Sequence, residues 1–575
     1  QHITAEPPRV TQIRPLVPPH VEGAVTQALA KAPADRFRTV TQFGRALGRR
    51  AEDGWGAVPP KHVRRKPGLR GALGALKRKG SWRHALLAFS ILALALLGVF
   101  FKPWGEPSPR PLSALADRAF QDSVALLPFE GRGGDPTLDD MAERVADQIV
   151  LNLNRSGVVK VKAPFSVQRL LAAGVTATQL ADSLKVDRVI RGTLHRSGAG
   201  AEERVVLSTQ VSDPRTGNLE STPTLDAAVS DFDDAIASLA EGFVREFLQL
   251  YPNHALLEVG GPSFRGPGYE SYREGSEALG RRTPSGLARA RELFEDAIRQ
   301  NPANPYAYSA LSKYYSLADV YRYRTDLEAY QAAGMALALA RRAVELAPNL
   351  ADGYAARSII ARRSFAPSEE YEADCEQALE LEPAGAEVLA WCAPVLRLQG
   401  EDDLGLQAAE EAKEMDPQSA GRRMSLANIT LILRDYERAA FEAHVAWELE
   451  PEMMLPRALE AWSLLLLGDP EECLARELGP HQVLRATCLH ATGREAEAEA
   501  IVDSVRTALE TGNLEDSVYT EVVGTSDLAV HYAWLGNSEE SLRWVRESYD
   551  SSPSGIDSRV LGSGLFDRVS DDPAF

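Results

Sequence analysis

Apolar residues recur at helical spacing through the C-terminal half of the chain, and the same pattern returns at a regular interval. In "ARELFEDAIRQNP", Ala290, Phe294, Ala297 and Pro302 are separated by four, three and five residues. Spacings of three and four place the first three residues on one face of an amphipathic helix, and the proline ends that helix. The pattern returns, in part or in full, at Ala336, Ala343, Pro348, Ala378, Pro383, Ala412, Pro417, Ala446 and Pro451.

The interval between the prolines predicts the architecture of this half. Successive prolines are 46, 35, 34 and 34 residues apart, and a 34-residue period is typical of tetratricopeptide (TPR) repeats. Small alanines let the two helices of a repeat approach each other closely. Tyr308 and Leu311 stand at first-helix positions of such a repeat. We therefore expect a TPR-like helical array over residues 269–553 and a short C-terminal tail at 554–575.

The first interval is longer because it contains the insertion "LADVYRYRTDLEAYQAAG". This segment either lengthens a helix pair or forms a loop on the array. Its "YRYR" stretch, residues 321–324, either anchors a ligand carboxylate or is a solvated helix end. A solenoid presents an extended concave surface that suits binding, so the expected partner of the array is a protein or a peptide.

A different pattern, in which strands and helices are mixed, occupies residues 122–252. "DSVALLPFEG" predicts a buried strand and a turn, and Met141, Val145, Ile149 and Leu153 share one face of the next helix. "RVIRGTLHR" and "ERVVLSTQVS" predict two longer strands, the second followed by a hairpin turn at "DPRTGN". "GRGGDP" lacks the Gly-Lys-Ser/Thr ending of a phosphate-binding loop, which favours a surface turn. The segment therefore predicts a small α/β domain.

Three strings of this domain carry a family resemblance. "SVALLPF", "LADSLKVDRVIRGTL" and "RVVLSTQVSDPRTGN" resemble the N-terminal domain of the translocation protein TolB, as it occurs in bacterial TPR-containing regulators. The resemblance implies a protein-interaction or sensing module without shared catalytic residues.

The run "ALLAFSILALALLGVFF" contains no charged residue. We interpret it as a single transmembrane helix at residues 84–101, between linkers at 51–83 and 102–121. Trp82 and Trp104 suit the two interfacial belts of a membrane. Two alternatives are a buried core helix and a cleaved signal peptide. The expected fold class is thus mainly α: a TPR-like α-solenoid, preceded by a small α/β domain and one membrane helix.

Charge orients the predicted span. The basic run "KHVRRKPGLRGALGALKRKGSWR" precedes it, and it either binds anionic lipid or is a solvated linker. The positive-inside rule then predicts an inner-membrane protein with a cytoplasmic N-terminus and an extracytoplasmic C-terminal region. Residues 1–104 hold 18 Lys and Arg against 5 Asp and Glu, and the rest of the chain holds 45 against 76. Because the larger part is acidic, we expect no nucleic-acid partner.

The first 50 residues contain a second family resemblance. "EPPRVTQIRPLVPPHVEGAVTQALAKAPADRFRTVTQFGRAL" resembles the end of the catalytic lobe of bacterial serine/threonine protein kinases, and Lys31, Pro33, Arg36 and Phe37 match its pattern. In that family, the arginine at the position of Arg36 forms a buried ion pair. The Gly-rich loop and the HRD and DFG motifs are missing from this chain. The resemblance implies a kinase parent, with ATP and Mg²⁺ only in its missing lobe, and no enzyme in this chain.

The ends of the chain and its cysteines add two expectations. The first residue is Gln1 and no methionine precedes Met141, so we interpret the sequence as a fragment. The four cysteines lack CxxC spacing and are expected to be buried thiols, with one disulfide bridge as the alternative. His481, Cys488 and His490 are close in sequence but lack metal-ligand spacing, so neither a metal nor a cofactor is expected.

Two functional hypotheses follow. The first is the signalling and sensor part of a membrane-anchored Ser/Thr kinase, whose α/β domain and array bind a protein and bias homodimerisation. The second is a non-enzymatic TPR scaffold of the cell envelope with a vestigial kinase tail. A transcriptional or cyclase regulator is a third alternative, for which the sequence shows no effector domain.

Overall fold

The computed structural model describes residues 120, 122–198, 203–229, 231–251, 266–321, 323, 325–363, 367–398, 400–511, 521–551 and 562–572, together with Gly23, Thr26 and Gln27. Within it, Trp104–Phe575 form one compact unit. The predictions of a kinase remnant with Arg36 and Phe37, of a basic linker and of a membrane helix bounded by Trp82 and Trp104 lie outside the described residues.

The predicted localisation needs correction. No helix in the described part of the chain is long and apolar enough to cross a membrane. The prediction of a single-pass inner-membrane protein is wrong on this finding. Helix α6 (Pro136–Ser156) has 21 residues, but it is amphipathic and carries charged side chains, among them Asp139, Asp140 and Glu143, beside its apolar face. The hydrophobic run that suggested the span, residues 84–101, lies outside the described residues.

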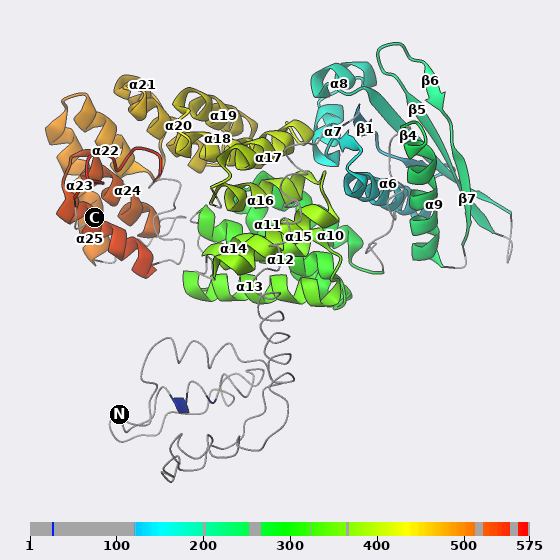
Figure 1. The fold of residues 1–575 in the computed structure, drawn as a ribbon, viewed down its shortest axis with the longest axis horizontal. Coiled ribbons are helices and arrows are strands. Elements are labelled where there is room, and N and C mark those ends of the chain that lie inside the picture. Colours follow the sequence, from blue (N-terminus) through cyan, green and yellow to red (C-terminus); the bar gives the residue numbers. More distant parts are fainter. Residues whose placement is uncertain are drawn as a thin grey trace, which may run out of the picture. The chain divides into compact units, whose positions relative to one another are not determined.

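The α/β domain contains a mixed sheet of seven described strands (Figure 1). The main strand order is β3-β1-β4-β5-β6. Strand β1 is parallel to its neighbours β3 and β4, whereas β4 is antiparallel to β5. The two remaining strands extend the sheet, because β2 pairs with β4 and β7 pairs with β5. The strands are β1 (Asp122–Leu126), β2 (Glu130–Gly131), β3 (Val159–Val161), β4 (Arg188–Ser197), β5 (Arg204–Ser212), β6 (Leu219–Ser221) and β7 (Thr224–Ala228). The "DPRTGN" turn joins β5 to β6, as the sequence predicts.

Helices cover both faces of this sheet. Alternation along β1 directs Val124 and Leu126 to the core shared with α6 and α9 (Phe232–Leu248), and directs Ala125 to the core shared with α7 (Pro164–Ala172) and α8 (Ala177–Leu184). "GRGGDP" forms an exposed turn, in which Asp135 caps α6 by accepting a hydrogen bond from the Thr137 amide at 3.0 Å.

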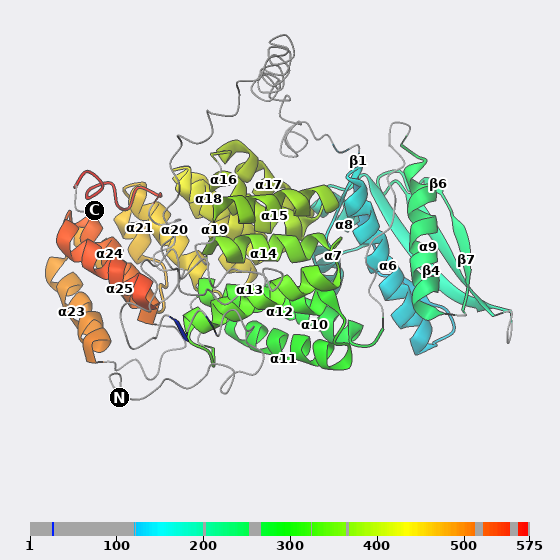
Figure 2. The ribbon, with the colours of Figure 1, turned by 60° about the horizontal axis from the view of Figure 1, so that its bottom comes forward.

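The array consists of paired helices that stack along the chain (Figures 1 and 2). In the described residues, eight consecutive pairs run from α10 to α25. The pairs are α10 (Tyr269–Arg281) with α11 (Pro284–Gln300), α12 (Pro305–Val320) with α13 (Ala329–Leu346), α14 (Ala351–Arg363) with α15 (Ser368–Leu381), α16 (Ala386–Leu398) with α17 (Asp402–Met415), α18 (Ala420–Ile432) with α19 (Tyr436–Leu449), α20 (Leu455–Leu466) with α21 (Pro470–Leu474), α22 (Gln482–Ala491) with α23 (Glu495–Thr511), and α24 (Glu521–Trp534) with α25 (Ser538–Ser551). The prediction of a TPR-like solenoid after a small α/β domain is confirmed.

The repeated alanine–proline spacing has a local structural cause. In each of the first five pairs, the second helix is followed by one residue and then by a proline. The residue before the proline has an extended backbone, because the proline ring disfavours helical geometry at that position. Each pre-proline N–H donates to the carbonyl of the repeated alanine. The pre-proline residues, with their φ angles, are Asn301 (−140°), Ala347 (−142°), Glu382 (−143°), Asp416 (−131°) and Glu450 (−139°). The acceptors are Ala297, Ala343, Ala378, Ala412 and Ala446.

The insertion lengthens the second pair rather than forming a loop alone, since α13 has 18 residues. Near the other end of the array, α21 has only five residues, and a Cys473–Cys488 disulfide joins it to α22. Cys375 and Cys392 are free and fully buried. Cys375 and Cys392 are therefore buried thiols, as expected. Cys473 and Cys488 instead form the single disulfide bridge that was the alternative expectation.

Candidate functional site

The α/β domain contacts the array along a seam made by three successive pre-proline residues, Glu382, Asp416 and Glu450. Asp416 accepts a hydrogen bond from the Ser166 hydroxyl at 2.6 Å, and Glu450 accepts one from Arg169 Nη1 at 2.7 Å. Glu382 accepts a longer one, 3.5 Å, from the Asn154 amide. The donors come from α6 and α7, while the acceptors are spaced by the 34-residue repeat. The repeat period of the array therefore matches the spacing of donors on the α/β domain.

Backbone hydrogen bonds reinforce this seam. The Ala163 amide donates to the Met415 carbonyl at 2.8 Å, and the Ala384 amide donates to the Asn154 carbonyl at 3.1 Å. Lys162 Nζ adds a bond of 2.7 Å to the Glu414 carbonyl. The two backbone–backbone bonds fix the two parts at one register, because neither of their partners can change rotamer.

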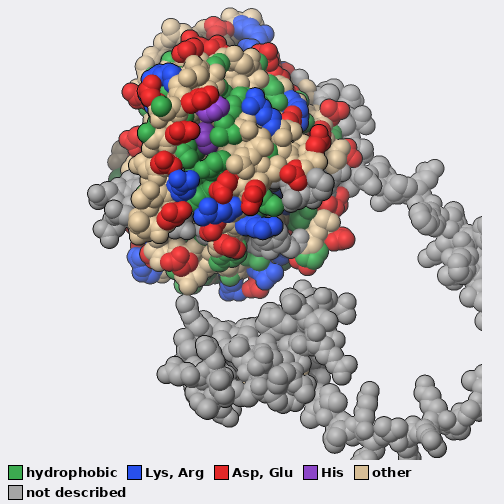
Figure 3. All heavy atoms as spheres, turned by 90° about the vertical axis from the view of Figure 1, so that its left-hand side faces the viewer, with side chains coloured by type: hydrophobic (Ala, Val, Ile, Leu, Met, Phe, Trp, Pro, Cys, Tyr) green, Lys and Arg blue, Asp and Glu red, His purple; other side chains and the backbone are tan. Residues whose placement is uncertain are grey.

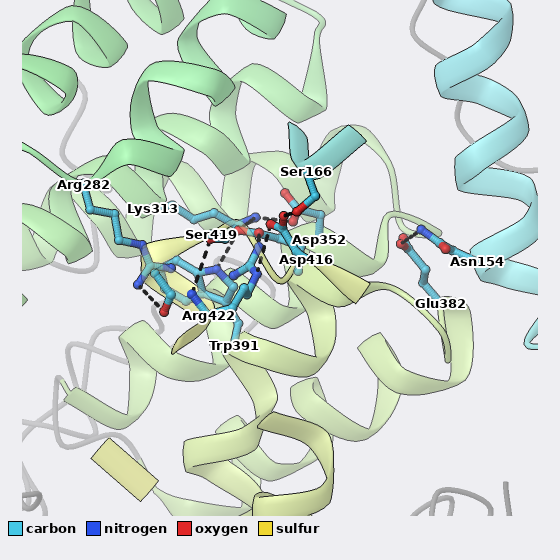
Figure 4. A network of polar contacts seen from close by, with 12 residues as sticks. Asn154, Ser166, Arg282, Lys313, Asp352, Glu382, Trp391, Asp416, Ser419 and Arg422 are labelled. Atoms are coloured by element: carbon cyan, nitrogen blue, oxygen red, sulfur yellow. Dashed lines mark hydrogen bonds and ion pairs between the residues drawn. The ribbon is translucent and has the colours of Figure 1, made fainter. Parts of the chain in front are cut away.

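Next to the seam, charged side chains from the first helices of successive pairs form a polar network (Figure 4). Glu387 at the start of α16 accepts hydrogen bonds from Lys313 Nζ at 3.0 Å and from Trp391 Nε1 at 2.7 Å, and it also pairs with Arg422. Lys313 pairs in addition with Asp352. The network joins α12, α14, α16 and α18, so it holds four repeats together.

The network fixes the protonation of its members. Burial alone would raise the pKa of Glu387, but the positive charges of Arg422 and Lys313 hold it well below its usual range. Burial alone would lower the pKa of Lys313, but Asp352 and Glu387 raise it. Arg422 is 7% exposed, and its Nε and Nη1 atoms have no hydrogen-bond partner among the described residues.

On one side of the network lies a pocket of about 80 Å³, which we call the arginine pocket. Its basic lining residues are Arg282, Arg362, Arg363 and Arg397, and no aspartate or glutamate is among its described lining residues. The walls are apolar and come from α12, α14, α16 and α18. They include Leu317, Val320, Ile359, Trp391, Met424 and Ile429.

Two tyrosines of the "YRYR" stretch position one of these arginines. Arg282 Nη1 donates to the Tyr321 hydroxyl at 3.0 Å, and the Tyr323 hydroxyl donates to the Arg282 carbonyl at 3.1 Å. Tyr321 and Tyr323 are 3% and 7% exposed. The interpretation of these two residues as a solvated helix end is wrong, because their rings pack against the array. The arginines of the stretch, Arg322 and Arg324, lie outside the described residues, so the ligand-anchor interpretation stays a prediction.

On the other side of the network lies a larger cavity, about 380 Å³, which we call the interdomain cavity. Helices α6 and α7 of the α/β domain form one wall, and residues from α10, α12 and the starts of α14, α16 and α18 form the other. Burial raises the pKa of Glu382 to about 7, and it does the same for Glu143, where Asp147 adds to the effect. The cavity therefore holds carboxylates that have lost part of their hydration.

The residues predicted to pack the array lie in its helix pairs. Ala290, Phe294, Ala297, Ala336, Ala343, Ala378, Ala412 and Ala446 are at most 1% exposed on second helices, and Leu311 is 6% exposed on α12. Tyr308 is half-buried. Pro302, Pro348, Pro383, Pro417 and Pro451 each lie two residues after a helix ends. None of these side chains lines the arginine pocket or the interdomain cavity.

The sequence prediction missed the charged residues of the site. A signal for the seam was present, because acidic residues precede Pro383, Pro417 and Pro451, whereas Asn301 and Ala347 precede the two earlier prolines. No group of three metal-ligating side chains occurs within the described residues. Cys488 forms a disulfide with Cys473, so its sulfur is not a free thiolate that could bind a metal together with His481 and His490.

Comparisons with known proteins give only structural likenesses. No protein-family model matches the chain, and no curated protein does. Among solved structures, the thermophilic TPR protein TTC0263 of Thermus thermophilus is 22% identical over 34% of this chain and 99% of its own, with a TM-score of 0.27. YrrB, a TPR protein with an unusual peptide-binding site, is 17% identical over 35% of this chain and 99% of its own, with a TM-score of 0.23. A TPR protein from Parabacteroides merdae is 14% identical over 53% and 99%, with a TM-score of 0.27.

These three neighbours are TPR repeat proteins, but TM-scores this low carry no inference about a ligand. The TPR-like architecture of this chain rests on its own helix pairs and their spacing. The comparisons add no support for the predicted kinase remnant, membrane span or TolB resemblance.

Proposed function

We propose that the chain is a protein-interaction scaffold whose array binds an extended acidic peptide segment in the arginine pocket. The observation that carries this proposal is the charge of the pocket: four arginines line it, with no carboxylate among its described lining residues. Residues 105–575 hold 45 Lys and Arg against 76 Asp and Glu, so a basic recess in this part of the chain is a specific feature. Guanidinium groups bind carboxylates through paired, charge-assisted hydrogen bonds.

Two further features support a peptide rather than a small anion. Leu317, Ile359 and Ile429 provide apolar walls for side chains that flank the acidic group. Asn428 is 7% exposed, and its Oδ1 has no hydrogen-bond partner among the described residues. A peptide N–H would satisfy this buried acceptor, whose unpaired state is costly. The proposal is for a binding protein and includes no reaction and no cofactor.

The test uses a fluorescent peptide of alternating glutamate and leucine, and a second in which glutamine replaces glutamate. We expect the glutamate peptide to bind, with an affinity that falls as salt is added. Arg397→Glu should weaken binding by at least about tenfold, because it puts a like charge in the pocket. Arg299→Glu is the matched control, since Arg299 is 70% exposed on α11 and outside the pocket. Equal binding of both peptides, or no effect of Arg397→Glu, would refute the proposal.

The finer sequence prediction, a role in Ser/Thr kinase signalling, rests on residues 1–50. Apart from three isolated residues, these lie outside the described part of the chain. It stays a prediction, and the binding proposal does not depend on it. The alternative hypothesis, a non-enzymatic TPR scaffold with a vestigial kinase tail, is equally compatible with acidic-peptide binding.

A further inference from the structure

The interdomain cavity is separate from the arginine pocket and has its own chemistry. Its volume, about 380 Å³, is within the range of about 300–1,000 Å³ typical of small-molecule sites, which often lie between domains. Neither domain forms it alone, because Asn154 and Phe165 of the α/β domain face Tyr272 and Tyr306 of the array across it. A ligand here would contact both parts of the molecule.

The inner end of the cavity favours an anionic or acceptor group. Arg422 lines the cavity, is 7% exposed, and has two guanidinium nitrogens without a hydrogen-bond partner among the described residues. It lies in the first turn of α18, a helix of 13 residues whose N-cap, Ser419, also lines the cavity. Arg422 Nε forms an ion pair with Oδ2 of Asp416 at 4.0 Å, whereas Nη1 has neither a hydrogen bond nor an ion pair among the described residues. The positive end of the helix dipole and the Nη1 hydrogens both attract a carboxylate.

The accessible part of the cavity has the opposite charge. Seven acidic side chains but four cationic ones line it, and burial raises the pKa of two of the acidic ones, Glu143 and Glu382, to about 7. Glu143 and Glu277, whose side chains are 35% and 38% exposed, share a single cation, Arg273, which is 24% exposed. The side chains of Lys313 and Arg422 are 4% and 9% exposed and already pair with Glu387. A ligand that enters therefore meets mainly negative charge, which favours a cationic group.

We propose that the interdomain cavity binds a small zwitterion of the free amino acid class, with its carboxylate toward Arg422 and its ammonium toward the exposed carboxylates. An anion without a cationic group would meet the excess of carboxylates. An amine without an acceptor would leave Nη1 of Arg422 without a hydrogen-bond partner among the described residues. Tyr272, Leu350 and Tyr306 provide apolar surface for the ligand's side chain. This proposal is independent of acidic-peptide binding, because the two sites are lined by largely different residues.

Thermal unfolding and titration calorimetry on the full chain test the ligand class. The probes are the free L-amino acids, and the amino acid with the largest effect is then compared with its decarboxylated amine and its α-keto acid. We expect the amino acid to raise the unfolding temperature, since it binds the folded state only. The amine and the keto acid should bind at least about tenfold more weakly. Stabilisation by no amino acid, or equal binding of the amine, overturns the proposal.

A pair of glycine variants locates the site. Gly280 of α10 lines the cavity, and a Cβ atom added there meets nothing within 4 Å, so Gly280→Leu places a side chain in the open space. Gly334 of α13 is equally open but is exposed and outside the cavity, which makes Gly334→Leu the matched control. We expect Gly280→Leu alone to abolish amino acid binding. Unchanged binding would overturn the assignment.

A second variant decides the question if Gly280→Leu fails to fold, as judged by circular dichroism against Gly334→Leu. Glu277→Gln removes one exposed charge at the surface of α10 and leaves the Arg422 network untouched. It should weaken amino acid binding while leaving acidic-peptide binding unchanged. No change in amino acid affinity would contradict the proposal, and parallel loss of both ligands would indicate a general folding defect instead of a shared site.

Discussion

The Ser166 hydroxyl donates a hydrogen bond of 2.6 Å to Oδ1 of Asp416, 250 residues later in the chain. The same hydroxyl accepts a bond of 3.0 Å from the Gln418 amide. Asp416 is 6% exposed, and burial raises its pKa. This single serine therefore links the α/β domain to a carboxylate and a backbone group at the turn between α17 and α18.

Removing this hydroxyl should weaken the seam. In Ser166→Ala, the buried Asp416 loses a hydrogen-bond donor, which typically costs about 1–3 kcal/mol. Urea unfolding monitored by circular dichroism should show that loss in the free energy of unfolding. Ser285→Ala is the control, because the Ser285 hydroxyl is exposed and its contact with Glu452 is 3.3 Å. Equal stability of the two variants would contradict the role given to Ser166.

Two glycines on α10 should respond in opposite directions to the same substitution. A Cβ atom at Gly275 would lie 2.6 Å from the ring of Phe294, which is fully buried, so Gly275→Ala overpacks the helix pair and should cost about 1–3 kcal/mol. At Gly280 the same atom meets nothing, so Gly280→Ala should gain up to about 1 kcal/mol of helix propensity. Thermal unfolding of both variants measures the difference in stability. A gain in stability in both variants would contradict the prediction, because it would show that the Phe294 ring moves aside at little cost.

The repeat was predictable because its determinants are local. Ala378 and Pro383 act within one helix end: the proline forces Glu382 into an extended backbone, and the Glu382 amide then bonds to the Ala378 carbonyl. Such a relationship spans five residues and returns with each repeat. Helix pairing and the strand pattern of the α/β domain follow from similarly short-range spacing.

The site was not predictable in this way because its partners are far apart. Glu387 and Arg422 are 35 residues apart, and Ser166 and Asp416 are 250 apart. Each of these residues looks like an ordinary solvated side chain in sequence. The tyrosines of "YRYR" show the same limit: their basic neighbours suggested exposure, whereas packing against Arg282 buries both rings.

Figure 3 shows the C-terminal face of the array, where acidic and basic side chains are interspersed and form no single-sign surface.

Glu382 should make stability depend on pH near neutrality. Burial raises its pKa from an ordinary value of 4.5 to about 7, so the folded state holds a proton that the unfolded state releases. The stabilising contribution of Glu382 to the free energy of unfolding is therefore fully present below about pH 4.5, and it is lost as the pH rises through 7. Glu382→Gln keeps a neutral side chain of the same size and should be more stable than the wild type at pH 8, by up to about 3 kcal/mol.

Urea titrations at pH 5 and pH 8 measure this effect, and the exposed Glu380 on the same helix provides the control variant Glu380→Gln. Because burial also raises the pKa of Glu143 to about 7, the wild type should lose only part of its pH dependence in Glu382→Gln. If Glu380→Gln changed the pH dependence of stability as much as Glu382→Gln does, that dependence would come from surface charge and not from the burial of Glu382.

The Cys473–Cys488 disulfide should stabilise the part of the array where the second helix is shortest. It closes a 15-residue loop between α21 and α22, and loop entropy predicts about 3 kcal/mol for a loop of this length. Replacing both cysteines with alanine should lower the unfolding temperature, and a reducing agent should do the same to the wild type but not to the variant. Cys375 and Cys392 provide the internal control: both are fully buried, so iodoacetamide should label neither in the native oxidised protein and both after unfolding. Labelling of four cysteines in the unfolded, unreduced protein, measured by mass spectrometry, would show that the bridge is absent and that all four are thiols.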